Sequence, residues 1–433
     1  MCRWLRLKGR EVRILLLGLN YSPELTGIGK YSGEMMEWLA EQGHEVRVVT
    51  APPYYPEWRI REDYGWWEYR REQSPAGATI YRCPLYVPSR PNGLRRMLHL
   101  GSFAASTLPV MLSQAFWRPD VVMTIEPALF CAPTVALIAA MCAAPAWLHV
   151  QDFEIDAAFD LELLPAGGMI HRFALFYERT VMQTFDRVSS ISPNMVRRLG
   201  SKGIEKEKTV LFPNWVDVDE VMASAPGTQA NAYRRELGIR DDQIVLLYSG
   251  NLGHKQGLEI LPMVAEALKD REDLHFIFCG DGAYRRPIEQ LTVDLPNVSL
   301  LHLQPKERLN ELLNAADIHL LPQRADAADL VMPSKLTGMM ASGRPVLTTA
   351  ARGTQLAEAV EGCGVVVPPG DANAFIAAVS HLAADRELRL ELGLAARRYA
   401  EEHMGRDYVL RRFEKEMLSL LASEPALKVF ERP

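Results

Sequence analysis

A glycine-containing loop near the start of the chain has the composition of a phosphate-binding loop. Gly27 and Gly29 lie in the stretch NYSPELTGIGKY, after the apolar run of residues 12–17, which ends at Gly18. Backbone N–H groups of such a loop, and the first turn of the helix after it, can donate hydrogen bonds to phosphate oxygens. A plain turn is the simpler alternative for two glycines with this spacing.

The spacing of these glycines differs from that of nicotinamide dinucleotide-binding proteins. In their G-x-G-x-x-G fingerprint the first glycine follows the strand directly, and an acidic residue ends the next strand. Here eight residues separate Gly18 from Gly27. A third glycine, Gly33, comes one position late, and the next strand ends at Thr50 rather than at an acid. The sequence therefore argues against a nicotinamide cofactor.

A lysine in the second half of the chain has a helix start beside it. Lys335 follows Pro333, which favours the first turn of a helix, and Ser334, which can cap one. We therefore expect the Lys335 ammonium beside a helix N-terminus, where it can bind phosphate. A solvated helix residue is the simpler alternative for one isolated lysine.

An acidic loop follows an apolar strand in the stretch WLHVQDFEIDAAFD. Its acids are Asp152, Glu154, Asp156 and Asp160. A solvated turn would explain them, but carboxylates at a strand end can also line a binding site, and Asp152 is the first candidate. His149 precedes Gln151 by two residues and therefore lies on the same face of the strand.

The elements around these residues alternate between strand and helix. Residues 12–17 predict a buried strand, residues 31–41 a helix, and residues 46–49 a second strand. The pattern starts again near residue 243, where QIVLLYSGNLGHKQGLEI predicts a strand, a glycine-rich loop and a helix start. This repetition predicts an α/β fold with two doubly wound, Rossmann-like domains.

Length and composition agree with two soluble domains. The chain has 433 residues, of which 48% are apolar and 24% charged. Its formal charge of -6 is uneven, because residues 1–214 carry a net +2 and the remainder -8. The first half is therefore the better candidate for contact with an anionic partner or membrane surface. The scattered cysteines indicate reduced thiols, and no nucleic-acid-binding pattern is present.

One segment of the first half is unusually apolar. Gly93 to Trp117 is almost free of acids and begins with Arg95, Arg96 and His99. Pro109 and Gln114 argue against a membrane-spanning helix, which leaves an interfacial segment or a buried helix. The N-terminus has too short an apolar run for a signal peptide, so we expect a cytoplasmic protein.

Several stretches resemble motifs of the family 4 glycosyltransferases. They are SPELTGIGKYSGEM, FPNWVD, YSGNLGHKQGLE and ADIHLLPQRADAADLVMPSKLTGMMASGRPVLTT, and the resemblance runs from about residue 14 to residue 408. YSPELTGIGKY, HEVRVVTAPPYYPEW, RCPLYVP and LHLGSFA are most similar to members that assemble exopolysaccharide of the colanic acid type. The resemblance implies the GT-B fold, in which two Rossmann-like domains face a central cleft.

The resemblance also implies domain bounds. We expect an N-terminal, acceptor-binding domain at residues 1–228 and a C-terminal domain, which binds the nucleotide sugar, at residues 229–404. A final helix at about residues 405–433 should pack back on the first domain.

The family's donor site maps onto named residues. Its diphosphate lies against the N-domain glycine loop, matched by Gly27 and Gly29, and against basic groups matched by Lys255 and Lys335. Such groups stabilise a leaving diphosphate. The remaining expected donor-binding residues are Asn251, Gly280, Gly282, Ser334 and Leu336. The expected catalytic residues, in contact with sugar or acceptor, are Asp152, Gln151, His149 and Asp329.

The sequence departs from the family pattern at several of these positions. Asn251 replaces a usual arginine, so Lys335 must supply more of the positive charge. Leu330 and Gly338 replace the family's paired glutamates, and Asp329 is the nearest surviving acid. Gln151 aligns with the family's strand-end histidine, which touches the donor sugar.

The stretch VDVDEV imitates the Asp-x-Asp metal motif of another glycosyltransferase fold. In family 4 the same place is a linker motif, matched here by Asn214 and Asp217. We therefore expect no metal.

The resemblance implies a retaining glycosyltransferase. Its donor would be a nucleoside diphosphate sugar, with GDP-fucose one candidate, and its acceptor a polyprenyl-diphosphate-linked oligosaccharide of exopolysaccharide assembly at the inner membrane surface. The alternatives are a sugar-nucleotide 2-epimerase on the same fold and an inactive GT-B-like scaffold that binds nucleotide.

Overall fold

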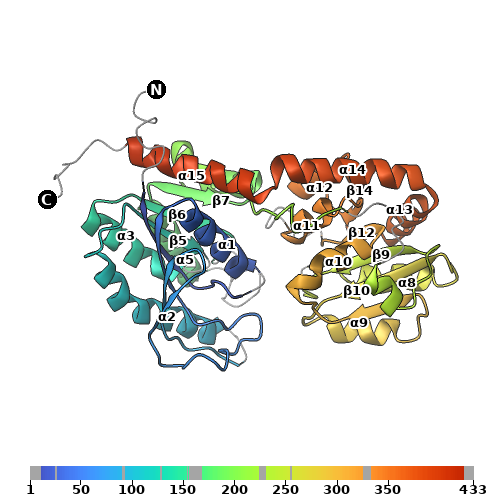
Figure 1. Ribbon diagram of the computed structural model, residues 1–433, viewed down its shortest axis with the longest axis horizontal. Coiled ribbons are helices and arrows are strands. Elements are labelled where there is room, and N and C mark those ends of the chain that lie inside the picture. The colour runs from blue at the N-terminus through green and yellow to red at the C-terminus, as the bar shows by residue number, and fades with distance from the viewer. Residues whose placement is uncertain are drawn as a thin grey trace. The chain divides into compact units, whose positions relative to one another are not determined.

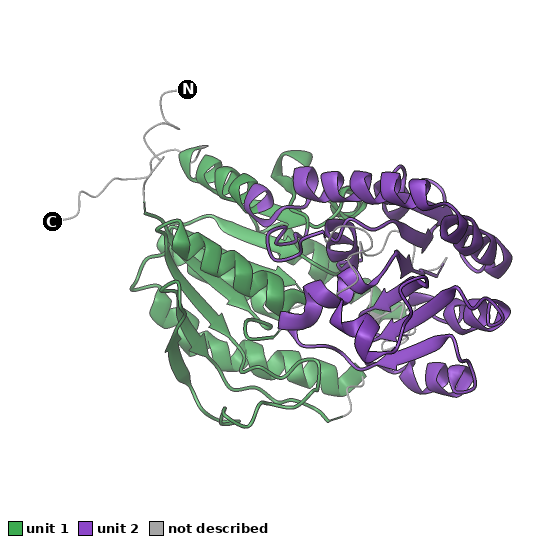
Figure 2. Cartoon of the chain, turned by 45° about the vertical axis from the view of Figure 1, so that its right-hand side comes forward, with its two compact units in different colours: residues 1–213, 410–433 green, residues 214–409 purple. Residues whose placement is uncertain are grey.

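The structure is a computed structural model that describes residues 11–24, 27–89, 93–126, 129–153, 155, 168–223, 231–253, 256–324 and 333–423. The chain forms two compact units (Figures 1 and 2). Unit 1 contains Met1–Pro213 and Leu410–Pro433, and unit 2 contains Asn214–Val409. The first unit boundary thus lies before the expected domain boundary at residue 228, and the second lies after residue 404.

Unit 1 is built on an eight-stranded sheet with the order β3-β4-β2-β1-β5-β6-β7-β8. All neighbouring strands pair in parallel except β3 and β4. The apolar runs of β1, β5 and β6 are buried, as expected for a parallel sheet covered on both faces. The strands are β1 (Arg13–Gly18), β2 (Glu45–Thr50), β3 (Arg70–Gln73), β4 (Thr79–Arg82), β5 (Val121–Glu126), β6 (Ala146–Val150), β7 (Arg187–Ser190) and β8 (Thr209–Leu211).

Helices cover both faces of this sheet. The described helices are α1 (Gly27–Glu41), α2 (Gly93–Gln114), α3 (Ala132–Cys142), α5 (Gly168–Met182), α6 (Pro193–Ser201) and α15 (Arg406–Ser423), with short 3-10 turns at Leu129–Cys131 and Lys206–Lys208. Helices α2, α3 and α5 pack on the core cluster that includes Leu148 of β6. Its neighbour Trp147 points to the other face, where it contacts Phe413 of α15 at 5.0 Å between ring centroids.

Unit 2 is built on a six-stranded, all-parallel sheet with the order β11-β10-β9-β12-β13-β14. The order reverses between β9 and β12, which is the kind of switch point where doubly wound sheets bind ligands. The strands are β9 (Ile244–Ser249), β10 (Leu274–Cys279), β11 (Val298–Leu301), β12 (Ile318–Leu321), β13 (Val346–Thr349) and β14 (Gly364–Val367).

The helices of unit 2 follow the same alternation. They are α7 (Ala232–Glu236), α8 (Ile260–Ala267), α9 (Arg285–Thr292), α10 (Leu309–Ala315), α11 (Lys335–Ala341), α12 (Gln355–Val360), α13 (Ala372–Ala384) and α14 (Arg386–His403), with a 3-10 turn at Lys306–Arg308. Their apolar faces form core clusters with the strands. Together the two units have the mixed α/β architecture expected from the sequence.

The stretch VDVDEV lies where the chain enters unit 2. Val216 forms an isolated parallel bridge with Gly405, just before the chain leaves unit 2 through α15. Asp217 accepts hydrogen bonds from the backbone N–H groups of Asp219 and Glu220, and its other oxygen pairs with Arg406 at 2.8 Å. These contacts give Asp217 a structural role.

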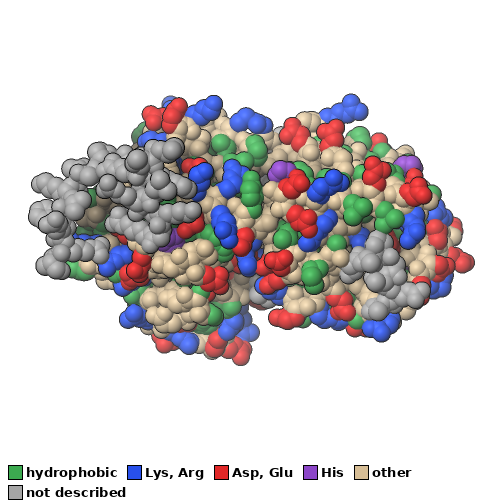
Figure 3. Space-filling model, turned by 45° about the horizontal axis from the view of Figure 1, so that its top comes forward, with side chains coloured by type: hydrophobic (Ala, Val, Ile, Leu, Met, Phe, Trp, Pro, Cys, Tyr) green, Lys and Arg blue, Asp and Glu red, His purple; other side chains and the backbone are tan. Residues whose placement is uncertain are grey.

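The apolar segment that begins at Gly93 folds as the 22-residue helix α2, which continues through Pro109. One side is buried and includes His99, Phe103 and Met111, whereas Leu98 and Leu112 are exposed. The segment is therefore neither wholly buried nor wholly exposed. Among the described helices, none has the length and apolar character that a membrane crossing requires. On the face shown in Figure 3, acidic and basic side chains are interspersed.

Candidate active site

The glycine loop of unit 1 follows β1 and leads into α1. Gly27 opens the helix with a φ of 60°, a backbone conformation that favours glycine. A side chain at Gly29 would meet Glu24, because an ideal Cβ there would lie 2.7 Å from the Glu24 Oε2 atom. Gly29 is therefore required for packing against Glu24, in addition to any contact with phosphate.

Glu24 is a buried carboxylate that joins this loop to the loop after β2. Its Oε1 atom accepts hydrogen bonds from the backbone N–H groups of Tyr54 and Tyr55, each at 3.1 Å. Its Oε2 atom accepts from the Asn20 side chain at 2.9 Å. Burial raises the pKa of Glu24, whereas these donors act in the opposite direction.

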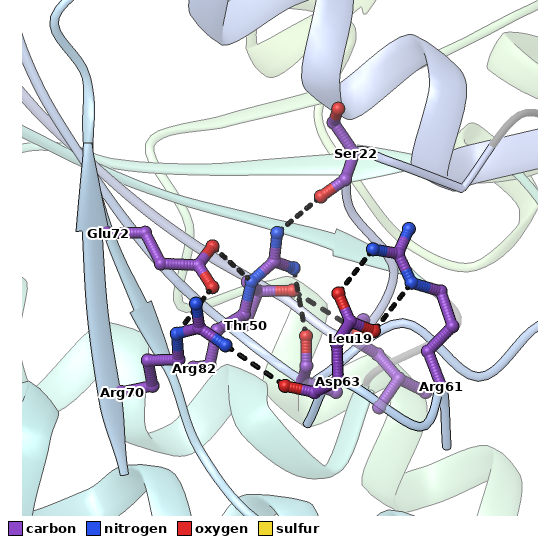
Figure 4. A network of polar contacts seen from close by, with 9 residues as sticks. Leu19, Ser22, Thr50, Arg61, Asp63, Arg70, Glu72 and Arg82 are labelled. Carbon is purple, nitrogen blue, oxygen red and sulfur yellow. Dashed lines mark hydrogen bonds and ion pairs between the residues drawn. The ribbon is translucent and has the colours of Figure 1, made fainter. Parts of the chain in front are cut away.

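Arg82 makes a second connection between the same two loops (Figure 4). Its guanidinium donates to the backbone oxygens of Ser22 at 2.5 Å and Ala51 at 3.0 Å. It also pairs with Glu72 at 3.2 Å, and the Arg82 side chain is only 2% exposed. Sequence analysis did not identify Glu24 or Arg82. The available signal for Arg82 was a charged residue within the apolar stretch TIYRCPLY.

His149 and Gln151 lie at the end of β6, and a hydrogen bond joins them. The Gln151 amide nitrogen lies 2.9 Å from His149 Nε2, and His149 Nδ1 lies 2.9 Å from Ser189 Oγ. Burial lowers the pKa of His149 to about 3, so its imidazole is neutral at physiological pH. His149 is thus placed to orient Gln151 and is too deeply buried to exchange protons with a substrate.

The acidic loop after β6 is described only in part. Asp152 is half-buried and directly follows Gln151. Glu154, Asp156 and Asp160 lie outside the described residues.

In unit 2, Lys335 is the first residue of α11 and lies beside the loop after β9. Its ammonium donates to the Tyr248 hydroxyl at 2.6 Å and lies 4.3 Å from the centroid of the same ring. The Tyr248 hydroxyl in turn donates to the backbone oxygen of Asn251 at 2.7 Å. Burial lowers the pKa of Lys335 to about 7 and raises that of the fully buried Tyr248. A partly neutral lysine of this kind gains its full charge when an anion binds beside it.

Glycines bring the backbones of neighbouring strand-end loops into contact here. An ideal Cβ at Gly280 would lie 1.9 Å from the Gly250 carbonyl oxygen, and one at Gly282 would lie 2.4 Å from the Leu252 oxygen. Backbone hydrogen bonds from Gly250 to Cys279 and from Leu252 to Asp281 join the same loops. The structure therefore brings Gly250, Asn251, Gly280, Gly282 and Lys335 together at the carboxyl ends of β9 and β10.

The other expected donor-binding residues differ in what they can contribute. The expected helix cap at Ser334 is wrong, because its backbone is helical, with φ -60° and ψ -24°, and its side chain makes no capping hydrogen bond. Leu336 is fully buried in the core, so only its backbone could meet a ligand. Lys255, Asp329 and Leu330 lie outside the described residues.

The described residues contain no cluster of three or more His, Cys, Asp or Glu side chains that could hold a metal ion. Positive charge and N–H donors at the strand ends of unit 2 can nevertheless stabilise an anionic leaving group without an ion.

Comparisons with known proteins identify the family of the chain. The Glycosyl transferase 4-like domain model matches residues 26–215, and the Glycosyl transferases group 1 model matches residues 229–399. The chain is 42% identical over 409 residues to the colanic acid biosynthesis glycosyl transferase WcaI of Escherichia coli (strain K12), a match that covers 93% of this chain and 98% of WcaI.

Solved structures show the same fold at low sequence identity. Sucrose-phosphate synthase from Thermosynechococcus elongatus has a TM-score of 0.74 and 19% identity, and the match covers 96% of this chain and 100% of that one. Anabaena Alr3699/HepE, in complex with UDP and glucose, has a TM-score of 0.67 and 15% identity over 94% of this chain and 99% of its own. From the two domain models and the full-length relative, we conclude that the chain belongs to the family 4 glycosyltransferases of the GT-B fold.

Proposed function

We propose that this glycosyltransferase moves a sugar from a nucleoside diphosphate sugar to a polyprenyl-diphosphate-linked oligosaccharide during exopolysaccharide assembly. The relative WcaI, named for colanic acid biosynthesis, supports the pathway class because it matches nearly the whole chain. The complex of HepE with UDP and glucose supports the class of donor. GDP-fucose and UDP-sugars are the donors to test first.

The observation that carries this proposal is the Lys335 ammonium, held beside the close-packed loops after β9 and β10. A leaving diphosphate carries charge that must be stabilised as the glycosidic bond breaks. In our proposal Lys335 and Lys255 supply the positive charge. Gly27, Gly29 and the loops that contain Asn251, Gly280 and Gly282 supply N–H donors, and no metal takes part.

The proposed transfer retains the configuration of the anomeric carbon. Gln151, oriented by the neutral His149, would contact the donor sugar, and Asp152 or Asp329 would contact sugar or acceptor hydroxyls. The leaving phosphate would accept the acceptor's proton on the same face as the bond that breaks, so that no base is needed on the opposite face.

The acceptor determines the proposed location of the enzyme. A polyprenyl-linked substrate stays in the membrane, and we propose that the enzyme binds peripherally to the inner leaflet through the segment that begins with Arg95 and Arg96. No nucleic acid is expected as a partner.

A transfer assay tests the proposal. Purified protein is incubated with the lipid-linked acceptor and each donor in turn, with and without EDTA. We expect transfer from one donor, unchanged by EDTA, and proton NMR of the product should show the donor's anomeric configuration.

Other outcomes of this assay would support the rival functions. Release of nucleotide without acceptor, together with a free sugar inverted at C2, would indicate a 2-epimerase. Nucleotide binding without turnover on a broad panel would indicate an inactive scaffold. Loss of activity in EDTA with rescue by Mn²⁺ would contradict the metal-free mechanism, and inversion would contradict the same-face mechanism.

A further inference from the structure

Three neighbouring helices of unit 1 expose apolar side chains to solvent. Helix α3 contacts both α2 and α5, and the inner sides of all three pack on one core cluster. Their exposed large apolar residues, with those of the adjoining turns, are Leu94, Met97, Leu98, Leu108, Leu112, Phe116, Phe130, Leu137, Met141, Met169, Phe173 and Phe176. We call this surface the three-helix face.

Helix α3 contributes most to the unusual character of this face. No charged residue occurs between Leu129 and Pro145. A helix that covers a sheet normally presents polar residues to water, whereas one that is apolar on all sides is normally buried. The outward side of α3 nevertheless contains Leu137, which is 47% exposed, and Met141. This side is therefore suited to contact with another apolar phase.

Helix α5 extends the same apolar surface with aromatic residues. Phe173 is 69% exposed, and Met169 and Phe176 lie four residues before it and three residues after it, which places all three on one side of the helix. Phe116, just beyond α2, is 91% exposed. Contiguous exposed apolar residues of this size mark an interaction surface.

The exposed charged side chains on these helices are basic. Arg95 on α2 and Arg172 on α5 are exposed, and the described residues of α2 and α3 include no acid. The acid of α5, Glu178, is buried and pairs with Lys202 at 2.5 Å. An apolar face with exposed arginines and no exposed carboxylate on its helices complements an anionic, amphipathic partner.

An aromatic segment lies next to α2. Trp66 and Trp67 are largely exposed, and the nearby Tyr69 hydroxyl donates to the Ser106 backbone oxygen of α2 at 3.0 Å. Tryptophan and tyrosine are enriched where proteins meet the boundary between lipid and water.

We propose that the three-helix face docks on an anionic phospholipid bilayer, with α2, α3 and α5 in the plane of the interface. This inference deepens the proposed function and rests on it, because the lipid-linked acceptor is the reason to expect a bilayer as the partner. It adds α3, α5 and the Trp66–Trp67 segment to the region that touches lipid.

Vesicle co-sedimentation tests the proposal without donor or acceptor. Vesicles of phosphatidylcholine with phosphatidylglycerol should bind the full chain more tightly than phosphatidylcholine alone. Leu137→Glu combined with Phe173→Glu should weaken this binding on the order of tenfold or more, because two charges would enter the apolar boundary. Arg95→Glu combined with Arg96→Glu should reduce the preference for anionic vesicles.

A matched control distinguishes docking from general loss of structure. Leu394→Glu changes an exposed leucine of α14 in unit 2, which is 68% exposed, and should leave vesicle binding unchanged. Circular dichroism should show that all variants remain folded. Vesicle binding by the Leu137→Glu, Phe173→Glu variant equal to that of the wild type would overturn the proposal.

The result remains interpretable if glycosyl transfer fails, because the vesicles contain no acceptor. Conversely, transfer to a water-soluble short-chain acceptor with no vesicle binding would overturn the docking surface and the proposed peripheral location, and would leave the proposed glycosyl transfer standing. A dimer in analytical ultracentrifugation that the same double variant dissociates, without vesicle binding, would show that a second copy covers the face.

Discussion

The two units hold their strand-end loops together in different ways. In unit 2 the loops after β9 and β10 meet backbone to backbone, because a Cβ at Gly280 or Gly282 would collide with the carbonyl oxygen of Gly250 or Leu252. In unit 1 the loops after β1 and β2 are joined by two buried charged side chains, Glu24 and Arg82. The first arrangement should fail when any side chain is added, and the second when a charge is removed.

The largest expected effect comes from adding a methyl group at Gly280. With φ at 146° and the Gly250 oxygen only 1.9 Å from an ideal Cβ, Gly280→Ala must displace a loop. We expect a loss of stability of roughly 3–5 kcal/mol and weak binding of nucleoside diphosphate. Chemical denaturation and calorimetry measure the two effects.

Gly353→Ala is the matched control for this variant. Gly353 also has a positive φ, of 79°, but nothing lies within 4 Å of its ideal Cβ. The backbone conformation alone should cost about 1 kcal/mol. Equal losses of stability for Gly280→Ala and Gly353→Ala would show that the close contact between the loops after β9 and β10 adds nothing to the cost of the backbone conformation.

The second effect concerns the charged connection in unit 1. Arg82→Met leaves two backbone oxygens without their donor and breaks one ion pair of Glu72, which keeps its ion pair with Arg70. The change should cost about 3 kcal/mol of stability. Arg61→Met is the control, because the Arg61–Asp63 pair in the same network is about half exposed, so its loss should change stability far less (Figure 4). Thermal unfolding that ranks the two variants in the opposite order would show that Arg82 does not hold the two loops of unit 1 together.

The contrast between the units also shows what the sequence can predict. Apolar runs such as residues 12–17 and 244–248 indicated buried parallel strands, because a strand covered on both faces needs apolar residues throughout. The position of Lys335 at a helix start followed from Pro333. These signals are local, and the structure agrees with them.

The partners of these residues could not be predicted in the same way. Arg82 meets Ser22 and Ala51 only because β4 lies next to β2, which is a property of the strand order. Tyr248 meets Lys335 across 87 residues of sequence, and nothing near either residue encodes that contact. For the segment of α2 the sequence left an interfacial helix and a buried helix as alternatives. For α3 it gave no sign of exposed apolar residues, because an apolar stretch is equally typical of a buried helix.

The third effect is on ligand binding alone. Lys335→Ala should weaken binding of a nucleoside diphosphate by roughly 1.5–3 kcal/mol, because it removes a charge-assisted hydrogen bond from a partly buried site. We expect the same of Lys255→Ala. Lys269→Ala, which removes an exposed lysine of unit 2 paired with Glu266, should leave affinity unchanged. Unchanged affinity in both site variants by calorimetry would contradict the assignment.

The smallest effect, per pH unit, is the pH dependence of that same binding. Because burial lowers the pKa of Lys335 to about 7 from its ordinary value of 10.5, the free protein loses the ammonium proton as the pH rises above 7. An unfolded chain keeps that proton up to about pH 10.5. Burial of the charged ammonium therefore lowers the free energy of unfolding by its full amount below pH 7, and this loss of stability disappears as the pH rises from about 7 to about 10.5.

The affinity for a diphosphate has the opposite pH dependence and falls as the pH rises, because the anion favours the charged form of Lys335. A phosphate group with a pKa near 6 is fully ionised above pH 7, so a change in affinity there reports on the protein. Between pH 7.5 and 9 affinity should fall by up to about tenfold per pH unit, since each binding event must first return a proton to Lys335. Calorimetry in two buffers of different ionisation heat should show the uptake of about one proton near pH 8, and Lys335→Ala should abolish it. Affinity that stays constant across this range, with no proton taken up, would mean that Lys335 is already charged in the free protein and that the hydrogen bond to Tyr248 stabilises the ammonium form.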